Sequence, residues 1–171
     1  MLSLPVPYPD ELLYSVIARA GVHMGITSPK NLLDEIFRNR HIIATIDFPN
    51  HLQTVSANYP PSLNLTVLDL IYKHTLFPAY APFIPEQRRQ VCIRLMAGPT
   101  KGAIHLAVGA VASRVKQRNY LRYCPQCLKI QFQQFGEYYW MRKWQLAGAD
   151  CCSEHGPLYE SPFERYSQHR H

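Results

Sequence analysis

The amino-acid sequence predicts a mainly α-helical protein, in which a helical N-terminal domain is followed by a small module built around metal ligands. Apolar residues recur at helical spacing through most of the first hundred positions, and proline and capping signals mark the helix starts. Four of the five cysteines lie between positions 124 and 152. With 171 residues, of which 47% are hydrophobic, the chain can bury a substantial core.

The chain opens with an extended arm followed by a helix. Pro5, Pro7 and Pro9 disfavour a helix, because each fixes its own φ and restricts the preceding residue. From Asp10 onward the apolar residues take helical spacing, and Gly21 or Gly25 is expected to end this helix. Its predicted apolar face consists of Leu12, Leu13, Val16, Ile17 and Ala20.

A second helix is predicted from Ser28, which suits the N-cap position, and Pro29, which suits the first helical position. Its apolar face contains Leu32, Leu33, Ile36 and Phe37. Residues 10–38 therefore predict a helix-turn-helix-like pair, which can place its second helix in a DNA major groove. The alternative is a plain helical hairpin whose apolar faces pack together.

The next segment, residues 38–62, is not assigned, although Ile42, Ile43 and Ile46 suit a short strand or helix. Thr66 and Asp69 form a capping-box pattern before a helix that is apolar nearly all round and is expected to be buried. Its apolar residues are Val67, Leu68, Leu70, Ile71 and Leu76.

Two more helices are predicted before the cysteine-rich segment. Pro85 starts the first, which Gly98 and Pro99 end, and the second covers 103–116 with Gly109 weakening it. The sequence thus predicts an α-helical domain over residues 1–118 and a metal-binding module over residues 119–171.

Two ligand pairs define this module. Cys124 and Cys127 form a C-x-x-C pair, and Cys152 and His155 form a C-x-x-H pair, with 24 residues between the two pairs. Each pair is expected on a tight turn, and four thiolate or imidazole ligands are the set that Zn²⁺ prefers. The sequence therefore predicts one structural Zn²⁺ in a zinc-ribbon or zinc-finger module, with no open position for a catalytic water. Cys151 could replace Cys152, but the spacing to His155 favours Cys152.

Six aromatic residues lie between the two ligand pairs. We expect them to form the small core of the module, and stacking on nucleic-acid bases is the alternative. They are Phe132, Phe135, Tyr138, Tyr139, Trp140 and Trp144.

Positive charge is concentrated around the first cysteine pair. Residues 112–143 contain seven basic side chains against the single acid Glu137, which predicts an anionic partner such as DNA. A solvated surface is the alternative. The candidate DNA-binding residues are Arg114, Lys116, Arg118, Arg122, Lys129, Arg142 and Lys143.

Motifs of common enzyme classes are missing from the sequence. No histidine has a glutamate two positions later, as zinc deaminases require, and there is no P-loop, Rossmann glycine motif or G-x-S-x-G. No apolar run approaches the length of a membrane span. The sequence therefore predicts a cytosolic protein that is not an enzyme and has no membrane partner.

Several motifs together resemble one family. The opening LPVPYPDELLYSVIAR, the RYCPQC segment ending at Cys127 and the CSEHG segment ending at Gly156 resemble the TnsD/TniQ family of transposon target-selection proteins. SPKNLLD from Ser28, HTLFP from His74 and ASRVK ending at Lys116 are closest to its TnsD branch. TnsD proteins are longer, so this chain resembles their N-terminal part.

The resemblance implies target-site selection in DNA transposition. A member of this family would bind double-stranded attachment-site DNA and recruit the AAA+ ATPase regulator of the transposon, in the bacterial cytoplasm at the nucleoid. The alternative is a protein–protein adaptor that docks the ATPase, an RNA-guided complex or a second copy of the chain, with DNA recognised elsewhere. For docking, the candidate residues are Pro5, Pro7 and Tyr8, of which Tyr8 is expected to be exposed on the extended arm.

Overall fold

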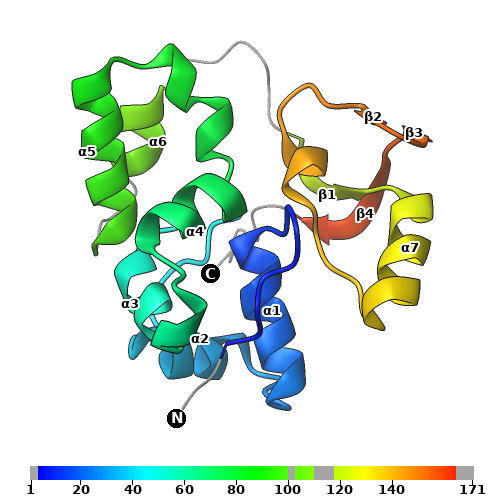
Figure 1. Cartoon of the computed structure of the whole chain (residues 1–171), viewed down its shortest axis with the longest axis horizontal. Coiled ribbons are helices and arrows are strands. Elements are labelled where there is room, and N and C mark those ends of the chain that lie inside the picture. The colour runs from blue at the N-terminus through cyan, green and yellow to red at the C-terminus, as the bar shows by residue number, and fades with distance from the viewer. Residues whose placement is uncertain (1–3, 100–102, 110–117, 165–171) are drawn as a thin grey trace.

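The computed structural model describes residues 4–99, 103–109 and 118–164. Within them the protein is mainly α-helical with a few short strands (Figure 1). The α-helices are α1 (Leu13–His23), α2 (Pro29–Phe37), α3 (Leu52–Ala57), α4 (Val67–His74), α5 (Glu86–Ala97), α6 (Ala103–Val108) and α7 (Pro125–Phe135). The strands are β1 (Tyr120–Tyr123), β2 (Cys151–Cys152), β3 (Gly156–Pro157) and β4 (Tyr159–Glu164).

Helix α1 confirms the predicted first helix. Leu13, Val16, Ile17 and Ala20 are buried, as the helical spacing predicts. Gly21 does not end the helix but lies within it, and a Cβ at this position would stand 2.9 Å from the Leu32 side chain. A glycine here therefore lets α2 approach α1 closely, and the left-handed Gly25, with φ +65°, follows the end of the helix.

The predicted starts of α2 and α4 are also confirmed. Ser28 accepts a hydrogen bond from the Asn31 amide at 3.5 Å, and Pro29 is the first helical residue. At α4 the capping box is complete, because the Asp69 amide donates to the Thr66 hydroxyl and the Thr66 amide donates to the Asp69 carboxylate. Local side-chain chemistry fixes both helix starts.

The expectation that α4 is buried on all sides is wrong. Leu70 and Ile71 are buried, but Leu68 and Tyr72 are exposed. Leu76 is buried beyond the end of the helix. The short helix therefore packs by one side only, and its apolar residues did not reveal which side.

The unassigned segment contains a helix and an irregular stretch. Residues 42–46 form neither a strand nor a helix, yet Ile42 and Ile46 are buried there. Helix α3 follows and begins after His51, which has a left-handed backbone with φ +59°.

The two helices predicted before the cysteine-rich segment are also present. Helix α5 follows Pro85, and Gly98 caps its C-terminal end. Helix α6 ends before Gly109, and residues 110–116 of the predicted last helix lie outside the described residues.

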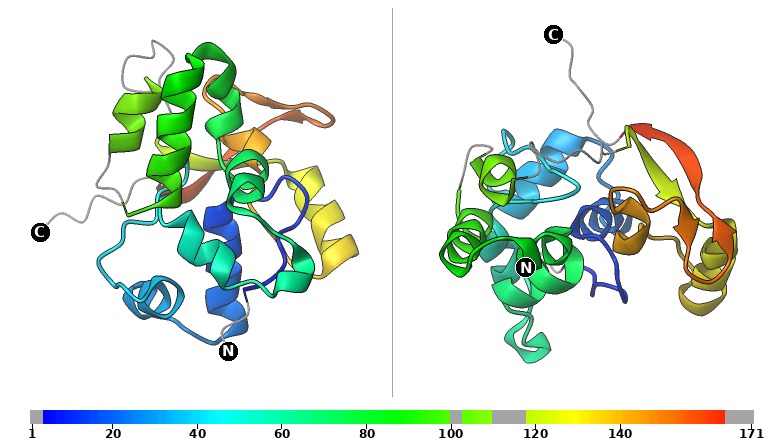
Figure 2. Two further views of the ribbon diagram at one scale, coloured as in Figure 1. Left: turned by 60° about the vertical axis from the view of Figure 1, so that its left-hand side comes forward. Right: turned by 90° about the horizontal axis from the view of Figure 1, so that it is seen from above.

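The strands form two separate antiparallel pairs, β1 with β4 and β2 with β3. One hydrophobic core joins α1 to α6 and includes Leu121 of β1. A second, smaller core contains Trp144 and three cysteines. Figures 1 and 2 show α1 between the other N-terminal helices on one side and α7 with the β1–β4 pair on the other.

Backbone hydrogen bonds join α1 to the segment after α7. The Leu12 amide donates to the Trp140 carbonyl at 2.9 Å, and the Arg142 amide donates to the Asp10 carbonyl at 2.7 Å. The Trp140 amide donates to the Ser15 hydroxyl at 3.0 Å. In the described residues, the candidate metal-binding module and the N-terminal helices thus share a direct interface.

A buried cluster of charges reinforces this interface. Arg19 contacts Glu11 of the same region at 2.8 Å and Glu137 of the module at 2.7 Å. Glu11 is 0% exposed, and its burial raises the pKa of its carboxyl group. The Arg19 guanidinium lowers the pKa of Glu137 to about 2, so this carboxylate stays ionised at neutral pH.

Substituting Arg19 should destabilise the fold strongly. Arg19→Met would leave Glu11 buried without its cation, which we expect to lower the free energy of unfolding by about 3 kcal/mol. Urea denaturation followed by circular dichroism measures this change. Lys129→Met, which removes an exposed cation, is the matched control and should change the value little; an equal effect of both variants would contradict the role of the buried cluster.

A second ion pair makes stability depend on pH. The His105 Nε2 atom lies 3.0 Å from the buried Asp47 carboxylate, which raises the pKa of His105 above 6.5. A raised pKa in the folded state adds stability below about pH 6.5, and this contribution is lost as the pH rises through the folded-state pKa. We expect the stability difference between wild type and His105→Gln, roughly 1 kcal/mol at pH 6, to shrink by pH 8.5. Urea denaturation at both pH values tests this, and a constant difference would contradict it.

Candidate metal centre

The first ligand pair lies where β1 passes into α7. Cys124 occupies the N-cap position of α7, and Pro125 is the first residue of the helix. Cys127 therefore sits in the first helical turn, on the same side as Cys124. This differs from the predicted tight turn, because Pro125 starts a helix here and does not form a turn.

The second pair lies on the β2–β3 hairpin. Cys152 pairs with Gly156 across the hairpin, and His155 stands in the turn between them. Gly156 has φ +102°, a backbone conformation that favours glycine. Although burial acts to raise the pKa of Cys152, the backbone amides of Glu154 and His155 help to lower it to about 6. The turn thus favours a thiolate at Cys152.

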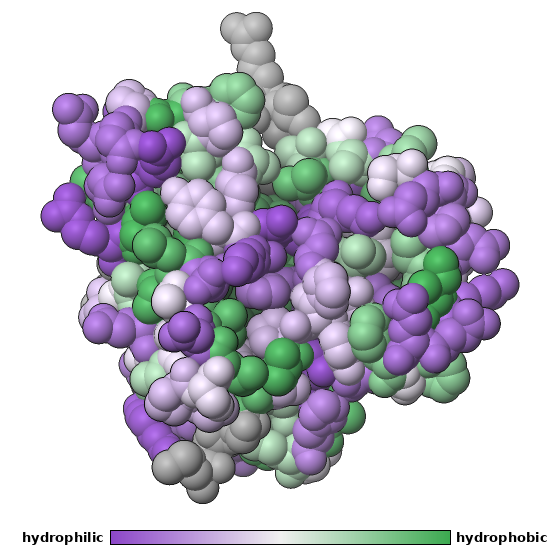
Figure 3. All heavy atoms as spheres, viewed as in Figure 1, coloured by the Kyte–Doolittle hydropathy of each residue, from purple (hydrophilic) through white to green (hydrophobic). Residues whose placement is uncertain are grey.

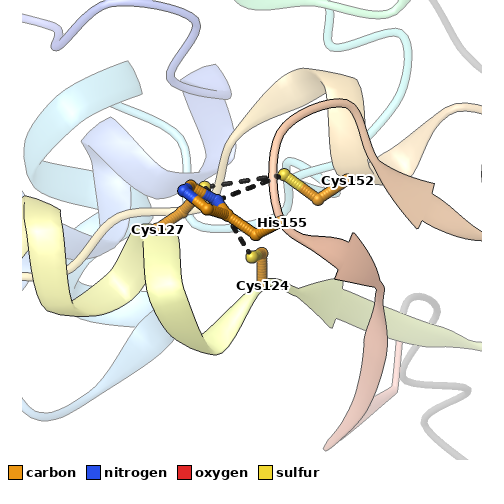
Figure 4. Close-up of side chains that lie close together, drawn as sticks. All are labelled: Cys124, Cys127, Cys152 and His155. Carbon is orange, nitrogen blue, oxygen red and sulfur yellow. Dashed lines mark hydrogen bonds between the residues drawn. The ribbon is translucent and has the colours of Figure 1, made fainter.

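The two pairs converge on one point (Figure 4). The His155 Nδ1 atom lies 3.6 Å from the Cys124 sulfur, 3.2 Å from the Cys127 sulfur and 3.7 Å from the Cys152 sulfur. The Cys127 and Cys152 sulfurs are 3.7 Å apart. In a tetrahedral zinc site, two sulfurs stand about 3.8 Å apart and a sulfur and a nitrogen about 3.5 Å. These four separations fit the edges of such a site, and all four ligand atoms lie within 4.8 Å of one another.

The electrostatics of the cluster also suit a cation. Burial, together with the neighbouring Cys152 and Cys124 thiols, raises the pKa of Cys127 to about 12. Thiolates this close therefore repel each other, and a divalent cation between them would reverse this effect. Cys124, Cys127, Cys152 and His155 form a cluster that could bind a metal ion.

The other two cysteines lie outside this cluster. Cys151 is exposed, so the structure favours Cys152 as the ligand, as the spacing predicts. Free cysteines are usually buried, and Cys151 departs from this because it is exposed. Cys92 is buried in the core of the N-terminal helices.

The aromatic residues between the ligand pairs do not all form a core. Trp144 packs among the cysteines, and Tyr139 is also buried. Trp140 packs against the core of the N-terminal helices. Phe132 and Tyr138 are 53% and 58% exposed and stack on each other with ring centroids 5.3 Å apart, and Phe135 is also exposed. The prediction of a common aromatic core is therefore wrong for these last three.

Two of the basic candidates make internal contacts, Arg122 within the module and Arg142 between the module and the N-terminal part. Arg122 is only 2% exposed, and its guanidinium donates to the carbonyls of Leu146, at 2.7 Å, and Ala149. Arg142 forms an ion pair with Asp10 at 2.9 Å and donates to the Tyr72 carbonyl. Both guanidinium groups thus serve contacts within the protein.

The remaining basic candidates differ in exposure. Arg118 is exposed and forms an ion pair with Asp150 at 2.6 Å. Lys143 lies 3.1 Å from Glu154, which raises the pKa of Lys143 against the effect of burial. Lys129 is exposed on α7. Arg114 and Lys116 lie outside the described residues. Figure 3 shows hydrophilic side chains over much of the module on this face, with small apolar patches between them.

The arm is placed differently from the prediction. Pro5 and Pro7 are half-buried. Tyr8 is half-buried as well, because its ring stacks on Phe135 with centroids 4.3 Å apart and its hydroxyl donates to Glu137 at 2.6 Å. The expectation that Tyr8 is exposed is therefore wrong.

Sequence reasoning missed the cluster of Glu11, Arg19 and Glu137. The one sequence feature that pointed to this cluster was Glu137, the single acid within the basic stretch.

Among the described residues, no helix has the length and apolarity needed to cross a bilayer.

Comparison with known proteins identifies the family of the chain. The family model described as TniQ matches residues 2–158. The chain is 48% identical over 172 aligned positions to the transposon Tn7 transposition protein TnsD of Escherichia coli, and the match covers 100% of this chain and 34% of that protein. The chain thus spans about a third of the length of this relative. Since the family model covers most of the chain, the protein belongs to the TniQ family.

Proposed function

We propose that this chain takes part in target-site selection during DNA transposition. The observation that carries the proposal is the 48% identity to the Tn7 protein TnsD along the whole chain. In this role the chain binds double-stranded attachment-site DNA and recruits the AAA+ ATPase regulator of the transposon. It acts in the bacterial cytoplasm at the nucleoid and performs no catalytic step itself.

The DNA contact is proposed near the metal-binding module. Arg118, Lys129 and Lys143 keep solvent exposure there, and Arg114 and Lys116 precede them in the sequence. Arg122 and Arg142 position the module rather than contact phosphate, because their guanidinium groups already serve internal carbonyls and Asp10. Basic side chains that remain at the surface supply the sequence-independent part of DNA affinity.

The second candidate function is that of a protein–protein adaptor. Val6 and Pro9 are exposed on the arm between anchored neighbours, which favours a docking role for the segment that contains Pro5, Pro7 and Tyr8. In this case the arm would dock the ATPase, an RNA-guided complex or a second copy of the chain. DNA would then be recognised by another part of the assembly.

We further propose that the metal is one structural Zn²⁺ held by Cys124, Cys127, Cys152 and His155. The support is the three-sulfur, one-nitrogen donor set and its tetrahedral spacing. The four ligands fill the coordination shell of the ion. Metal binding then supplies folding energy, on the order of 10 kcal/mol in small zinc domains.

Metal analysis tests the zinc proposal directly. Mass spectrometry of the metal content should find one zinc ion per chain in the purified protein. Cys152→Ala should lose the ion and the ordered module, because it removes a ligand, whereas Cys151→Ser should keep both. If Cys151→Ser loses the ion and Cys152→Ala keeps it, the proposed ligand set is wrong.

Charge reversal tests the DNA proposal. The triple variant Arg114→Glu, Lys116→Glu and Arg118→Glu should bind duplex DNA more weakly and with a flatter dependence on salt. The slope of log K against log salt should become shallower by about one for each phosphate that the variant no longer neutralises. Fluorescence anisotropy at several salt concentrations measures both changes.

The matched control reverses three exposed basic residues on α4 and α5. Lys73→Glu, Arg88→Glu and Arg94→Glu make the same change in net charge outside the basic stretch of residues 112–143. If both triple variants weaken DNA binding equally, only net charge matters and no interface near the module exists. Capture of the ATPase by a chain that does not bind duplex DNA would favour the adaptor.

A further inference from the structure

We propose that the metal-binding cluster positions the N-terminal arm through α7, and that Glu137 and Tyr8 form the contact between them. The inference rests on the proposed function in one respect, since it explains how the arm is presented for docking. It assigns Glu137 a positioning role, with the metal cluster at one end of α7 and the arm at the other.

Helix α7 has few other contacts that could hold it in place. Among its residues only Cys127 and Gln131 are buried, and Cys127 is one of the candidate metal ligands. The Gln131 side chain accepts a hydrogen bond at 3.2 Å from the amide of Tyr139. Tyr139 lies beyond the C-terminal end of the helix. Apart from Cys127 the helix has no fully buried apolar side chain, and Leu128 packs half-buried on the same small core, so the position of the helix depends mainly on the contacts at its two ends.

The N-terminal end of α7 is held by the metal cluster. Cys124 and Cys127 belong to a core that otherwise contains only Trp144 and Cys152 as buried members among the described residues. Three of these four side chains are ligands, so the core is small without an ion. Removal of the metal should therefore release this end of the helix first.

The C-terminal end of α7 holds Tyr8. Gly136, with φ +73°, ends the helix and turns the chain so that Glu137 faces the arm and α1. The Glu137 carboxylate accepts from the Tyr8 hydroxyl at 2.6 Å and pairs with Arg19 at 2.7 Å and His23 at 2.9 Å. One carboxylate thus joins the module both to the arm and to α1.

The Tyr8 ring is held from several sides. It stacks on Phe135 at 4.3 Å and lies 5.0 Å from Tyr139, both from the module. The Arg19 guanidinium lies 3.9 Å from the centroid of the ring, within the range of a cation–π contact. The left view of Figure 2 shows the arm passing beside α7.

The rest of the arm is held by the N-terminal helices. Leu4 is buried, the Tyr59 hydroxyl donates to the Pro5 carbonyl at 3.2 Å, and Arg19 donates to the Val6 carbonyl at 3.4 Å. Val6 itself is 55% exposed. The arm therefore presents Val6 between a fixed start and Tyr8, and at the Tyr8 end the module adds the contacts of Phe135 and Glu137 to those made by Arg19 and Glu11.

The two sites should be coupled in both directions. If the metal orders α7 and α7 orders Tyr8, thermodynamic linkage requires that Tyr8 and Glu137 strengthen metal binding. Neither side chain contacts a candidate ligand in the structure. An effect of these residues on metal affinity would thus be transmitted through the fold and not by direct ligation.

Hydrogen exchange is the first test. In the full chain, a chelator should speed the exchange of the amides of Tyr8 and Glu11, which donate to the Glu11 carboxylate and to the Tyr8 carbonyl. The amides of α4 and α5 should keep their protection. Equal protection of the arm with and without metal would overturn the proposal.

Metal affinity is the second test, and it decides the matter if the metal-free chain unfolds as a whole. We expect Tyr8→Ala and Glu137→Ala to weaken zinc binding about fivefold or more in competition with a chelator, and Tyr8→Phe to show a smaller effect. Tyr72→Ala, at an exposed tyrosine on α4, is the matched control and should bind zinc as the wild type does. Affinities of the Tyr8 and Glu137 variants within twofold of wild type would overturn the coupling.

These readouts separate the inference from the proposed function. Neither test uses DNA or the ATPase, so a negative result leaves target selection and docking standing. A chain that selects no target can still show the coupling between the metal and the arm.

Discussion

The contact of Arg19 with Glu11 and Glu137 is the interaction on which the arrangement of the two halves depends. Glu11 is fully buried, and a buried carboxylate without a cation is costly, so Arg19 has to remain beside it. The same guanidinium reaches Glu137 after α7, which draws the metal-binding module against α1. Backbone hydrogen bonds at Leu12 and Arg142 then fix the register of this interface.

The module needs this support because its own core is very small. Trp144 and three cysteines are its buried core, and Phe132 and Tyr138 remain exposed. A metal ion is the usual means by which such a small unit reaches a stable fold. We propose that the module is stabilised from two sources, the candidate ligand cluster at the start of α7 and the charged interface at its end, and that the helix between them couples the two.

The basic residues of the module likewise serve two purposes, internal contacts and surface charge. The basic stretch predicts an anionic partner, yet Arg122 and Arg142 donate to carbonyl groups and to Asp10 within the protein. Arginine suits this task because its planar fork can serve several acceptors at once. A count of basic residues thus overstates the charge available to DNA, and Arg118, Lys129 and Lys143 are better placed to contact it.

The sequence by itself determined the helix starts and the residues of the candidate ligand cluster, because both depend on residues a few positions apart. The Ser28 cap, the Thr66–Asp69 capping box and the C-x-x-C and C-x-x-H pairs are of this local kind. Tertiary structure decided what depends on distant partners: the irregular path of residues 42–46, the exposed side of α4, the exposure of Phe132, and the burial of Arg122 and Tyr8. Burial is set by which surfaces meet across the fold, and spacing along one segment carries no information about a partner more than a hundred residues away, as Tyr8 and Glu137 illustrate.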